Sequence, residues 1–143
     1  METFGDLGDK LVAGHSEVEH DFLKNKHQLS TLTMDGREVY RFATHQVPSS
    51  IIKAAAQSKI DLDEIDHFLL HQANKRIIEQ VARKLHQPLV KFPINIAEYG
   101  NTAASEAILL AECIQKKIIK KNDVVALSGF GGGLTVATLI FRF

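Results

Sequence analysis

Apolar residues recur along this chain at two spacings, one typical of helices and the other of strands. Three segments have helical spacing, and they cover residues 39–55, 77–85 and 107–118. Four short apolar or alternating runs predict strands at residues 67–70, 92–96, 124–127 and 134–143. Pro48 lies inside the first helical segment, so that helix is either kinked there or begins again near Pro48. Residues 1–33 have no clear period and predict a surface loop or a segment that packs against a neighbour.

The order of these elements is typical of an α/β fold. Strands and helices alternate, which favours parallel neighbouring strands joined by crossovers, and the last two strands form an antiparallel hairpin. The glycine-rich run 129–133 is the turn of this hairpin. In such sheets, ligands collect at the carboxyl ends of the strands. Three polar features follow predicted strands, namely His71, Asn101 and the glycine turn, so we expect them to meet at one edge of the sheet.

Composition and charge narrow the function classes. The 143 residues are 45% hydrophobic, and 17 basic residues balance 17 acidic ones, so any anionic ligand must be held by a local patch. No apolar run is long enough to span a bilayer, and the first residues do not resemble a signal peptide. Cys113 is the only cysteine, so no internal disulfide can form. We expect a cytoplasmic protein that binds neither nucleic acid nor membrane.

Two hydrogen-bond donors carry the candidate chemistry. His71 stands where a buried strand passes into a helix, and a neutral imidazole there can donate to an oxyanion. Asn101 also precedes a helix, and its side-chain amide is a second donor. Together they would stabilise a developing enolate or alkoxide. Each also has a structural explanation, because a lone histidine is usually structural or solvated and an asparagine before a helix is usually its N-cap.

Other residues give weaker signals. The glycine run could offer backbone amides to an oxyanion, or glycine could only meet the steric demands of the turn. Lys75, Arg76 and Arg83 could bind phosphates or an acidic carrier protein, although a solvated helix face also explains them. Cys113 lies on the apolar side of its helix, which predicts a small core residue rather than a nucleophile. No cluster of His, Cys and Asp has metal-ligand spacing.

Four motifs occur in an order that changes this picture. They are Met34-Asp35-Gly36-Arg37-Glu38-Val39-Tyr40, His71-Gln72-Ala73-Asn74, Tyr99-Gly100-Asn101-Thr102 and Gly129-Phe130-Gly131-Gly132-Gly133. With them the chain resembles the β-ketoacyl-[acyl carrier protein] synthase III family over residues 33–143, and only loosely before that. The resemblance implies a thiolase-like half-domain with a mixed sheet of about five strands, packed helices and a C-terminal β-hairpin. We therefore divide the chain into a loosely patterned leading segment, 1–33, and a carboxy-terminal thiolase-like catalytic domain, 34–143.

The resemblance also implies an activity. Enzymes of this family are acyltransferases that initiate fatty acid synthesis by decarboxylative Claisen condensation of an acyl-CoA with malonyl-[acyl carrier protein]. The nucleophilic Cys would lie in an amino-terminal half that this chain lacks. His71 and Asn101 would bind the malonyl thioester carbonyl, and the backbone of Gly132 would help to hold the acyl oxyanion. Asn74 would lie near the pantetheine arm, and Arg76 near the entrance for CoA or the carrier protein.

Partners and cofactors follow from the same resemblance. We expect acyl-CoA and acyl carrier protein to bind, a homodimer of the full enzyme to form, and no cofactor or metal to take part. The chain alone should be inactive and should expose a large apolar face, because half of a two-domain core is missing. It would be a domain excised from a longer enzyme or, less simply, the product of a half-gene that works with a separate amino-terminal half.

Some residues depart from the family pattern, and other functions stay open. The chain differs from frequent family residues at Glu106, Ile108 and Val136, and we expect these changes to affect helix packing and tunnel shape more than His71 or Asn101. A non-catalytic module that binds CoA or carrier protein is the main alternative function. A relative that esterifies a small alcohol or amine would keep the same fold, but such relatives often depart at the asparagine.

Overall fold

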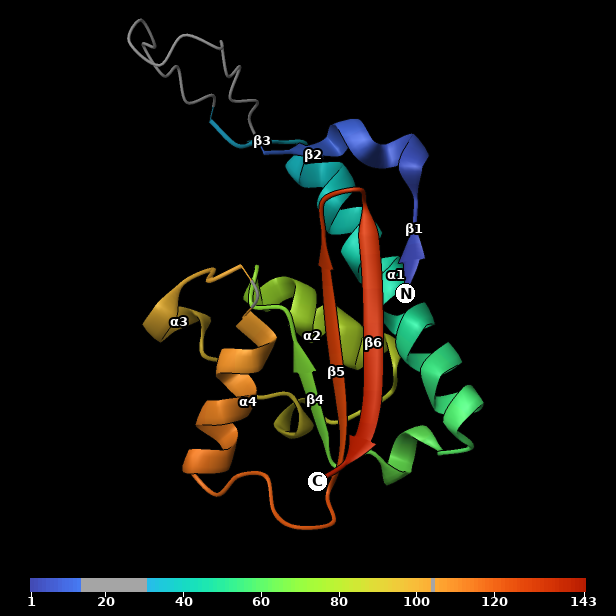
Figure 1. The fold of residues 1–143 in the computed structure, drawn as a ribbon, viewed down its shortest axis with the longest axis vertical. Coiled ribbons are helices and arrows are strands. Elements are labelled where there is room, and N and C mark those ends of the chain that lie inside the picture. The colour runs from blue at the N-terminus through green and yellow to red at the C-terminus, as the bar shows by residue number, and fades with distance from the viewer. Residues whose placement is uncertain (14–30, 104) are drawn as a thin grey trace, which may run out of the picture.

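The computed structural model describes residues 1–13, 31–103 and 105–143, which form a main sheet with helices on both faces (Figure 1). The strands are β1 (Glu2–Thr3), β2 (Leu11–Val12), β3 (Thr33–Met34), β4 (His67–Leu70), β5 (Val124–Gly131) and β6 (Thr135–Arg142). The α-helices are α1 (Gly36–Ser58), α2 (Lys75–Lys84), α3 (Ile96–Tyr99) and α4 (Ser105–Gln115). The short 3-10 helices are η1 (Gly5–Lys10), η2 (Leu62–Glu64) and η3 (Leu89–Lys91).

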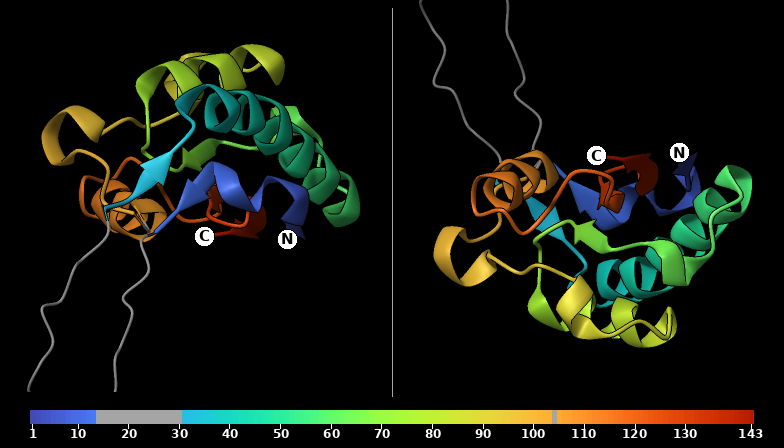
Figure 2. Two further views of the ribbon diagram at one scale, coloured as in Figure 1. Left: turned by 90° about the horizontal axis from the view of Figure 1, so that it is seen from above. Right: turned by 90° about the horizontal axis from the view of Figure 1, so that it is seen from below.

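The main sheet has four strands in the order β1-β6-β5-β4. β4 and β5 are parallel, β5 and β6 form an antiparallel hairpin, and β1 pairs with the start of β6. β2 and β3 form a separate two-stranded ribbon. Figure 2 shows α1 and α2 on one face of the sheet and α4 on the other. The predicted α/β fold, with a mixed sheet and a C-terminal hairpin, is confirmed.

β4 and β5 contain continuous apolar runs because helices cover both of their faces. Phe68 and Leu70 of β4 belong to the core under α1 and α2, whereas Leu69 belongs to the core under α4. β5 alternates in the same way, with Ala126 in the first core and Val125 in the second. Each of these side chains is at most 3% exposed. The two cores therefore fix the position of β4, and with it the residue that follows the strand.

α1 is one continuous helix that includes Pro48, so the alternative in which a new helix begins there is wrong. Its N-cap is Asp35, whose carboxylate accepts two backbone hydrogen bonds from the first turn. It ends at Lys59, which has a φ of 54° and closes the last turn through its N–H. Val47 and Ile51 flank the proline and are buried, so packing holds this part of the helix together. Among the described helices, none is both long and apolar enough to cross a membrane.

The predicted strand at residues 92–96 is wrong. Pro93 has no N–H to donate to a sheet, and the N–H of Asn95 donates instead to a side chain in the β4–α2 loop at 3.1 Å. The segment then enters α3. The apolar alternation has another cause, because Phe92 stacks on Phe68 of β4 with ring centroids 4.6 Å apart. The fourth strand of the main sheet is β1, which the sequence pattern does not indicate.

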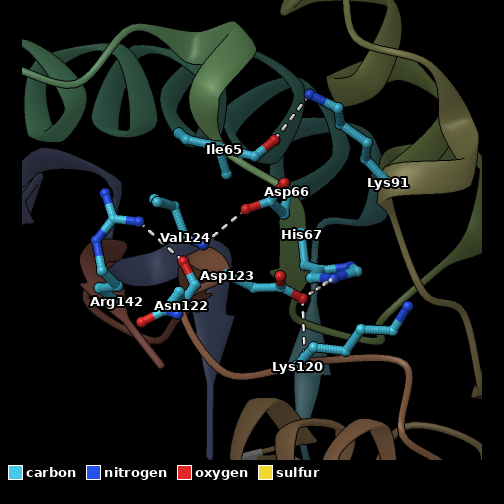
Figure 3. Close-up of polar contacts among 9 residues, drawn as sticks. All are labelled: Ile65, Asp66, His67, Lys91, Lys120, Asn122, Asp123, Val124 and Arg142. Carbon is cyan, nitrogen blue, oxygen red and sulfur yellow. Dashed lines mark hydrogen bonds and ion pairs between the residues drawn. The ribbon is translucent and has the colours of Figure 1, made fainter.

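A polar network closes the amino-terminal ends of β4 and β5 (Figure 3). Nε2 of His67 lies 3.0 Å from a carboxylate oxygen of Asp123. The Asp66 carboxylate accepts the N–H of Val124 at 2.8 Å. These polar groups connect the start of one strand to the start of the next. His71 follows the opposite end of β4, so the two histidines that bracket this strand lie in separate networks.

Candidate active site

His71 directly follows β4, at the carboxyl end of the parallel pair β4 and β5. Its backbone N–H donates to the carbonyl oxygen of Ser128 in β5 at 3.0 Å, so the strand ladder fixes its backbone. The imidazole packs edge-on against the ring of Phe130, with centroids 5.1 Å apart. Only 11% of the side chain is exposed. Backbone and ring are therefore both held, as a directional catalytic group requires.

The Nδ1 atom of His71 faces the first turn of α4. The hydroxyl oxygen of Ser105 lies 3.0 Å from this nitrogen, and a carboxylate oxygen of Glu106 lies 3.5 Å from it. Ser105 also accepts the backbone N–H of Gln72 at 3.0 Å. The hydroxyl keeps a second lone pair and its own hydrogen, so it can accept from Nδ1–H or donate to Nδ1, according to the tautomer of the ring.

Two opposing influences act on the charge of His71. Burial lowers the pKa of the imidazole below its usual value of 6.5, and this is the larger influence. The negative charge of Glu106 and a hydrogen bond with the Ala103 backbone raise the pKa, but by less. The neutral imidazole is therefore favoured near neutral pH.

Gln72 anchors the loop between β4 and α2. Its buried side chain donates to the carbonyl oxygen of Leu70 at 2.8 Å and accepts the N–H of Asn95 at 3.1 Å. Asn95 in turn donates to the Glu112 carboxylate of α4 at 2.7 Å. The loop is thus tied to the segment before α3 and to α4. Because a buried amide with satisfied partners is rigid, it holds the adjacent His71 in place.

Asn101 lies in the loop between α3 and α4. Its side-chain oxygen accepts the N–H of Ala103 at 3.2 Å, which leaves the two amide hydrogens free for another partner. The residue is exposed, and within the described part of the chain no hydrogen bond joins it to His71. The contact between Ser105 and His71 places the end of this loop beside the β4–α2 loop (Figure 1). Asn101 precedes α4 by several residues, so it is not the N-cap of that helix.

The remaining candidates lie near the same end of the sheet and are exposed. Asn74 is the N-cap of α2, and its side-chain oxygen accepts the N–H of Arg76 at 2.9 Å. Gly132 lies at the tip of the β5–β6 hairpin, where a Cβ would make only an ordinary contact with the Leu11 carbonyl oxygen. The neighbouring Gly133 has a φ of 123° and is the residue for which the turn requires glycine.

The expectation that Glu106 affects helix packing more than it affects His71 is wrong. Its carboxylate lies against the imidazole and over Gly129 of β5, in the space that a side chain at Gly129 would fill. Sequence reasoning also missed Ser105 as a partner of the ring. The available signal is two adjacent polar residues at the start of a helix, a few positions after Asn101.

Cys113 is confirmed as a core residue. It is 1% exposed between α4 and the sheet, and burial raises the pKa of its thiol, which disfavours the reactive thiolate. It is also the only cysteine of the chain, which therefore offers no accessible thiol nucleophile. Over residues 1–13, 31–103 and 105–143, no group of three His, Cys, Asp or Glu side chains could hold a metal ion.

This chain is similar in sequence to curated proteins over its whole length. A family model described as 3-oxoacyl-[acyl-carrier-protein (ACP)] synthase III C terminal matches residues 55–143. The β-ketoacyl-[acyl-carrier-protein] synthase III of Limosilactobacillus reuteri (strain DSM 20016) is 54% identical over 144 residues, which cover 100% of this chain and 44% of that protein. The protein of the same name from Lactobacillus helveticus (strain DPC 4571) is 50% identical over 145 residues, with the same coverage of 100% and 44%.

Solved structures match the fold. The 3-oxoacyl-(acyl carrier protein) synthase III of Pseudomonas aeruginosa PAO1 has a TM-score of 0.86 and 29% identity, over 99% of this chain and 42% of that one. The synthase III of Thermus thermophilus has a TM-score of 0.87 and 29% identity, over 99% and 44%. The predicted thiolase-like half-domain is confirmed, and the chain spans less than half the length of these relatives. The chain belongs to the 3-oxoacyl-[acyl-carrier-protein] synthase III family, and it matches the carboxy-terminal part of that family's proteins.

Proposed function

We propose that this chain is the carboxy-terminal catalytic part of an enzyme that condenses an acyl-CoA with malonyl-[acyl carrier protein], with loss of CO2, to initiate fatty acid synthesis. The observation that carries this proposal is the setting of His71. Nδ1 lies beside the Ser105 hydroxyl and the ring is packed against Phe130, so we assign Nε2 as the nitrogen that would donate to a substrate. The reaction needs no cofactor beyond its two substrates, and its substrates favour a cytoplasmic enzyme.

The chemistry assigned to the chain is stabilisation of an enolate. When the malonyl thioester loses CO2, the bond to the carboxylate breaks and its electron pair delocalises onto the thioester oxygen. Nε2–H of His71 and the amide hydrogens of Asn101 would donate to that oxygen. The carbanion then attacks an acyl group held on Cys in the amino-terminal half, and the thiolate leaves. The N–H of Gly132 would help to stabilise the oxyanion formed in this attack.

The start of α2 is the proposed contact for the substrate arms. Its first turn contains no acidic residue, and Lys75 and Arg76 are both exposed there. Exposed cations beside a helix N-terminus favour phosphate groups of CoA or acidic side chains of the carrier protein. Asn74 would contact the pantetheine arm through its amide hydrogens, since its oxygen already caps the helix.

The outward face of α4 supports the proposal that an amino-terminal half completes the enzyme. Leu109 and Cys113 bury one side of this helix against the sheet, yet Ile108 and Ile114 on its other side are 47% and 38% exposed. A helix that is apolar on both sides is usually buried on both. We therefore place the missing half, with its nucleophilic Cys, over α4, and expect the full enzyme to form a homodimer.

The test is condensation of acetyl-CoA with malonyl-[acyl carrier protein], by the chain alone and after addition of the part of the L. reuteri relative that the chain does not match. We expect activity only after the addition. His71→Ala and Asn101→Ala should each lower kcat by about 10²–10³-fold, because each removes a donor to the enolate oxygen. His45→Ala removes an exposed histidine of α1 and is the matched control, with activity unchanged.

Two results would contradict the proposal. One is a His71→Ala complex that condenses as fast as the wild type. The other is a folded wild-type complex that binds malonyl-[acyl carrier protein] and produces no product, which would favour the non-catalytic binding module.

A further inference from the structure

Glu106 is the charged side chain that faces His71 within the described part of the chain. We propose that Glu106 is a positioning residue: it orients the imidazole through Nδ1 and compensates a positive charge on the ring, so that Nε2–H becomes a charge-assisted donor to the substrate oxygen. For the identity of that substrate, the inference rests on the function proposed above. It concerns a position at which this chain departs from the frequent family pattern.

The start of α4 places the carboxylate for this role. Its nearer oxygen lies 3.5 Å from Nδ1 of His71, and only 14% of the Glu106 side chain is exposed. Ser105, one residue earlier, lies 3.0 Å from the same nitrogen. A doubly protonated ring would donate Nδ1–H to this pair of oxygens and keep Nε2–H for the substrate. The charged ring is the minor form near neutral pH. Hydrogen bonds from a charged donor are roughly twice as strong as neutral ones, so this minor form is the better stabiliser of an enolate.

Gly129 of β5 makes room for the carboxylate. A Cβ built at this position would collide with the Glu106 carboxyl group. Gly129 does not have a positive φ, so its backbone does not itself require glycine. A Cβ at Gly129 would therefore have to displace the end of the Glu106 side chain, whereas the conformation of the strand would accept it. This second observation, on an element distant in sequence, shows that the carboxylate occupies space that the absence of a side chain at Gly129 leaves open.

The other elements around the ring bring no competing charge within the described residues. β5 contributes the neutral ring of Phe130, and the α3–α4 loop contributes the Ala103 backbone. Lys75 at the start of α2 is exposed and pairs with Glu79 at 3.9 Å. Burial lowers the pKa of His71, and the charge of Glu106 is the larger of the two influences that oppose it. Removal of the Glu106 charge should therefore lower the protonated fraction of His71 at each pH near its titration midpoint.

The first measurement is an NMR titration of the histidine rings in the full chain labelled with 15N-histidine, with His71 assigned by its loss in His71→Asn. Glu106→Gln removes the charge and keeps the shape, so it should shift the titration midpoint of His71 to lower pH. Gly129→Ala displaces the carboxylate without altering it and should shift the midpoint in the same direction. Glu79→Gln is the matched control, which removes an exposed carboxylate of α2 and should leave the midpoint unchanged.

The second measurement is the pH dependence of condensation by the assembled protein. If the charged ring is the donor, activity falls as rising pH removes its proton. Glu106→Gln should move this alkaline fall to lower pH, whereas a purely structural role would lower activity equally at all pH values. Glu79→Gln should keep the wild-type profile.

The two measurements separate the inference from the function on which it rests. An unchanged midpoint of His71 in both Glu106→Gln and Gly129→Ala overturns the role of Glu106, whether or not the protein condenses its substrates. A shifted midpoint together with an unmoved alkaline fall overturns the charged donor. A shifted midpoint in an assembled protein that never condenses supports the pairing of Glu106 with His71 and refutes the proposed function.

Discussion

The burial of His71 connects the candidate site to the stability of the chain. Burial lowers the pKa of the folded imidazole below the 6.5 of an exposed histidine, so on acidification the unfolded chain takes up a proton first. The stability that depends on this group is therefore fully present above pH 6.5 and falls as the pH drops toward the lower folded pKa. We predict that the unfolding free energy of His71→Asn, which cannot take up this proton, falls less steeply with decreasing pH in that window. The difference in slope corresponds to the uptake of up to about one proton on unfolding.

Urea unfolding from about pH 8 to about pH 5 measures this difference. If the profiles of wild type and His71→Asn run parallel, folded His71 titrates as an exposed histidine does, and the account of its burial is wrong.

Candidate functional residues that follow strands could be found from the sequence, but the side chains that contact them in the folded structure could not. His71 is conspicuous because it ends a short apolar run, and Cys113 is recognisable as core because it shares the apolar side of its helix. The contact of Glu106 with His71 depends instead on the absence of a side chain at Gly129, which lies on another element. Spacing along the chain does not encode such a coincidence.

At the scale of elements, the turn of the β5–β6 hairpin contains two adjacent glycines with different structural roles. Gly133 has a φ of 123°, and a Cβ there would crowd the Thr135 side chain. Gly132 has neither problem. We predict that Gly133→Ala lowers the unfolding free energy by about 1–3 kcal/mol, whereas Gly132→Ala has a much smaller effect. Urea unfolding of the two variants checks this, and equal losses would show that the turn does not depend on the conformation of Gly133.

Elements with a clear hydrophobic periodicity could be predicted from the sequence. A strand that forms only by pairing with another strand, and a segment in which proline prevents a strand, could not. β4, α2 and the C-terminal hairpin lie where the pattern indicates. The alternation at 92–96 imitates a strand, but Pro93 removes a donor and Phe92 packs on β4 from outside the sheet. β1 is only two residues long and becomes a strand because β6 offers an edge to pair with.

For the whole molecule, the sequence predicts the family and the fold of the carboxy-terminal part that this chain forms. The order of the four motifs indicates the family, and this prediction agrees with the matching family model and with the solved structures. Spacing along this chain does not encode how the proposed amino-terminal half is arranged, and the structure presents the exposed apolar side of α4 to it. The nucleophilic Cys and the homodimer of the full enzyme are proposals that concern that half.

The most direct test of the central claim is release of CO2 from malonyl-[acyl carrier protein] by the assembled protein, with the nucleophilic Cys of the added half replaced by Ala. In the proposed mechanism, decarboxylation needs only the donors that this chain would supply, so the assay isolates their contribution from acyl transfer. We predict that CO2 release persists without the cysteine and falls by about 10²–10³-fold in His71→Ala. Release that disappears with the cysteine, or that is unaffected by His71→Ala, would contradict the assignment of enolate stabilisation to this half.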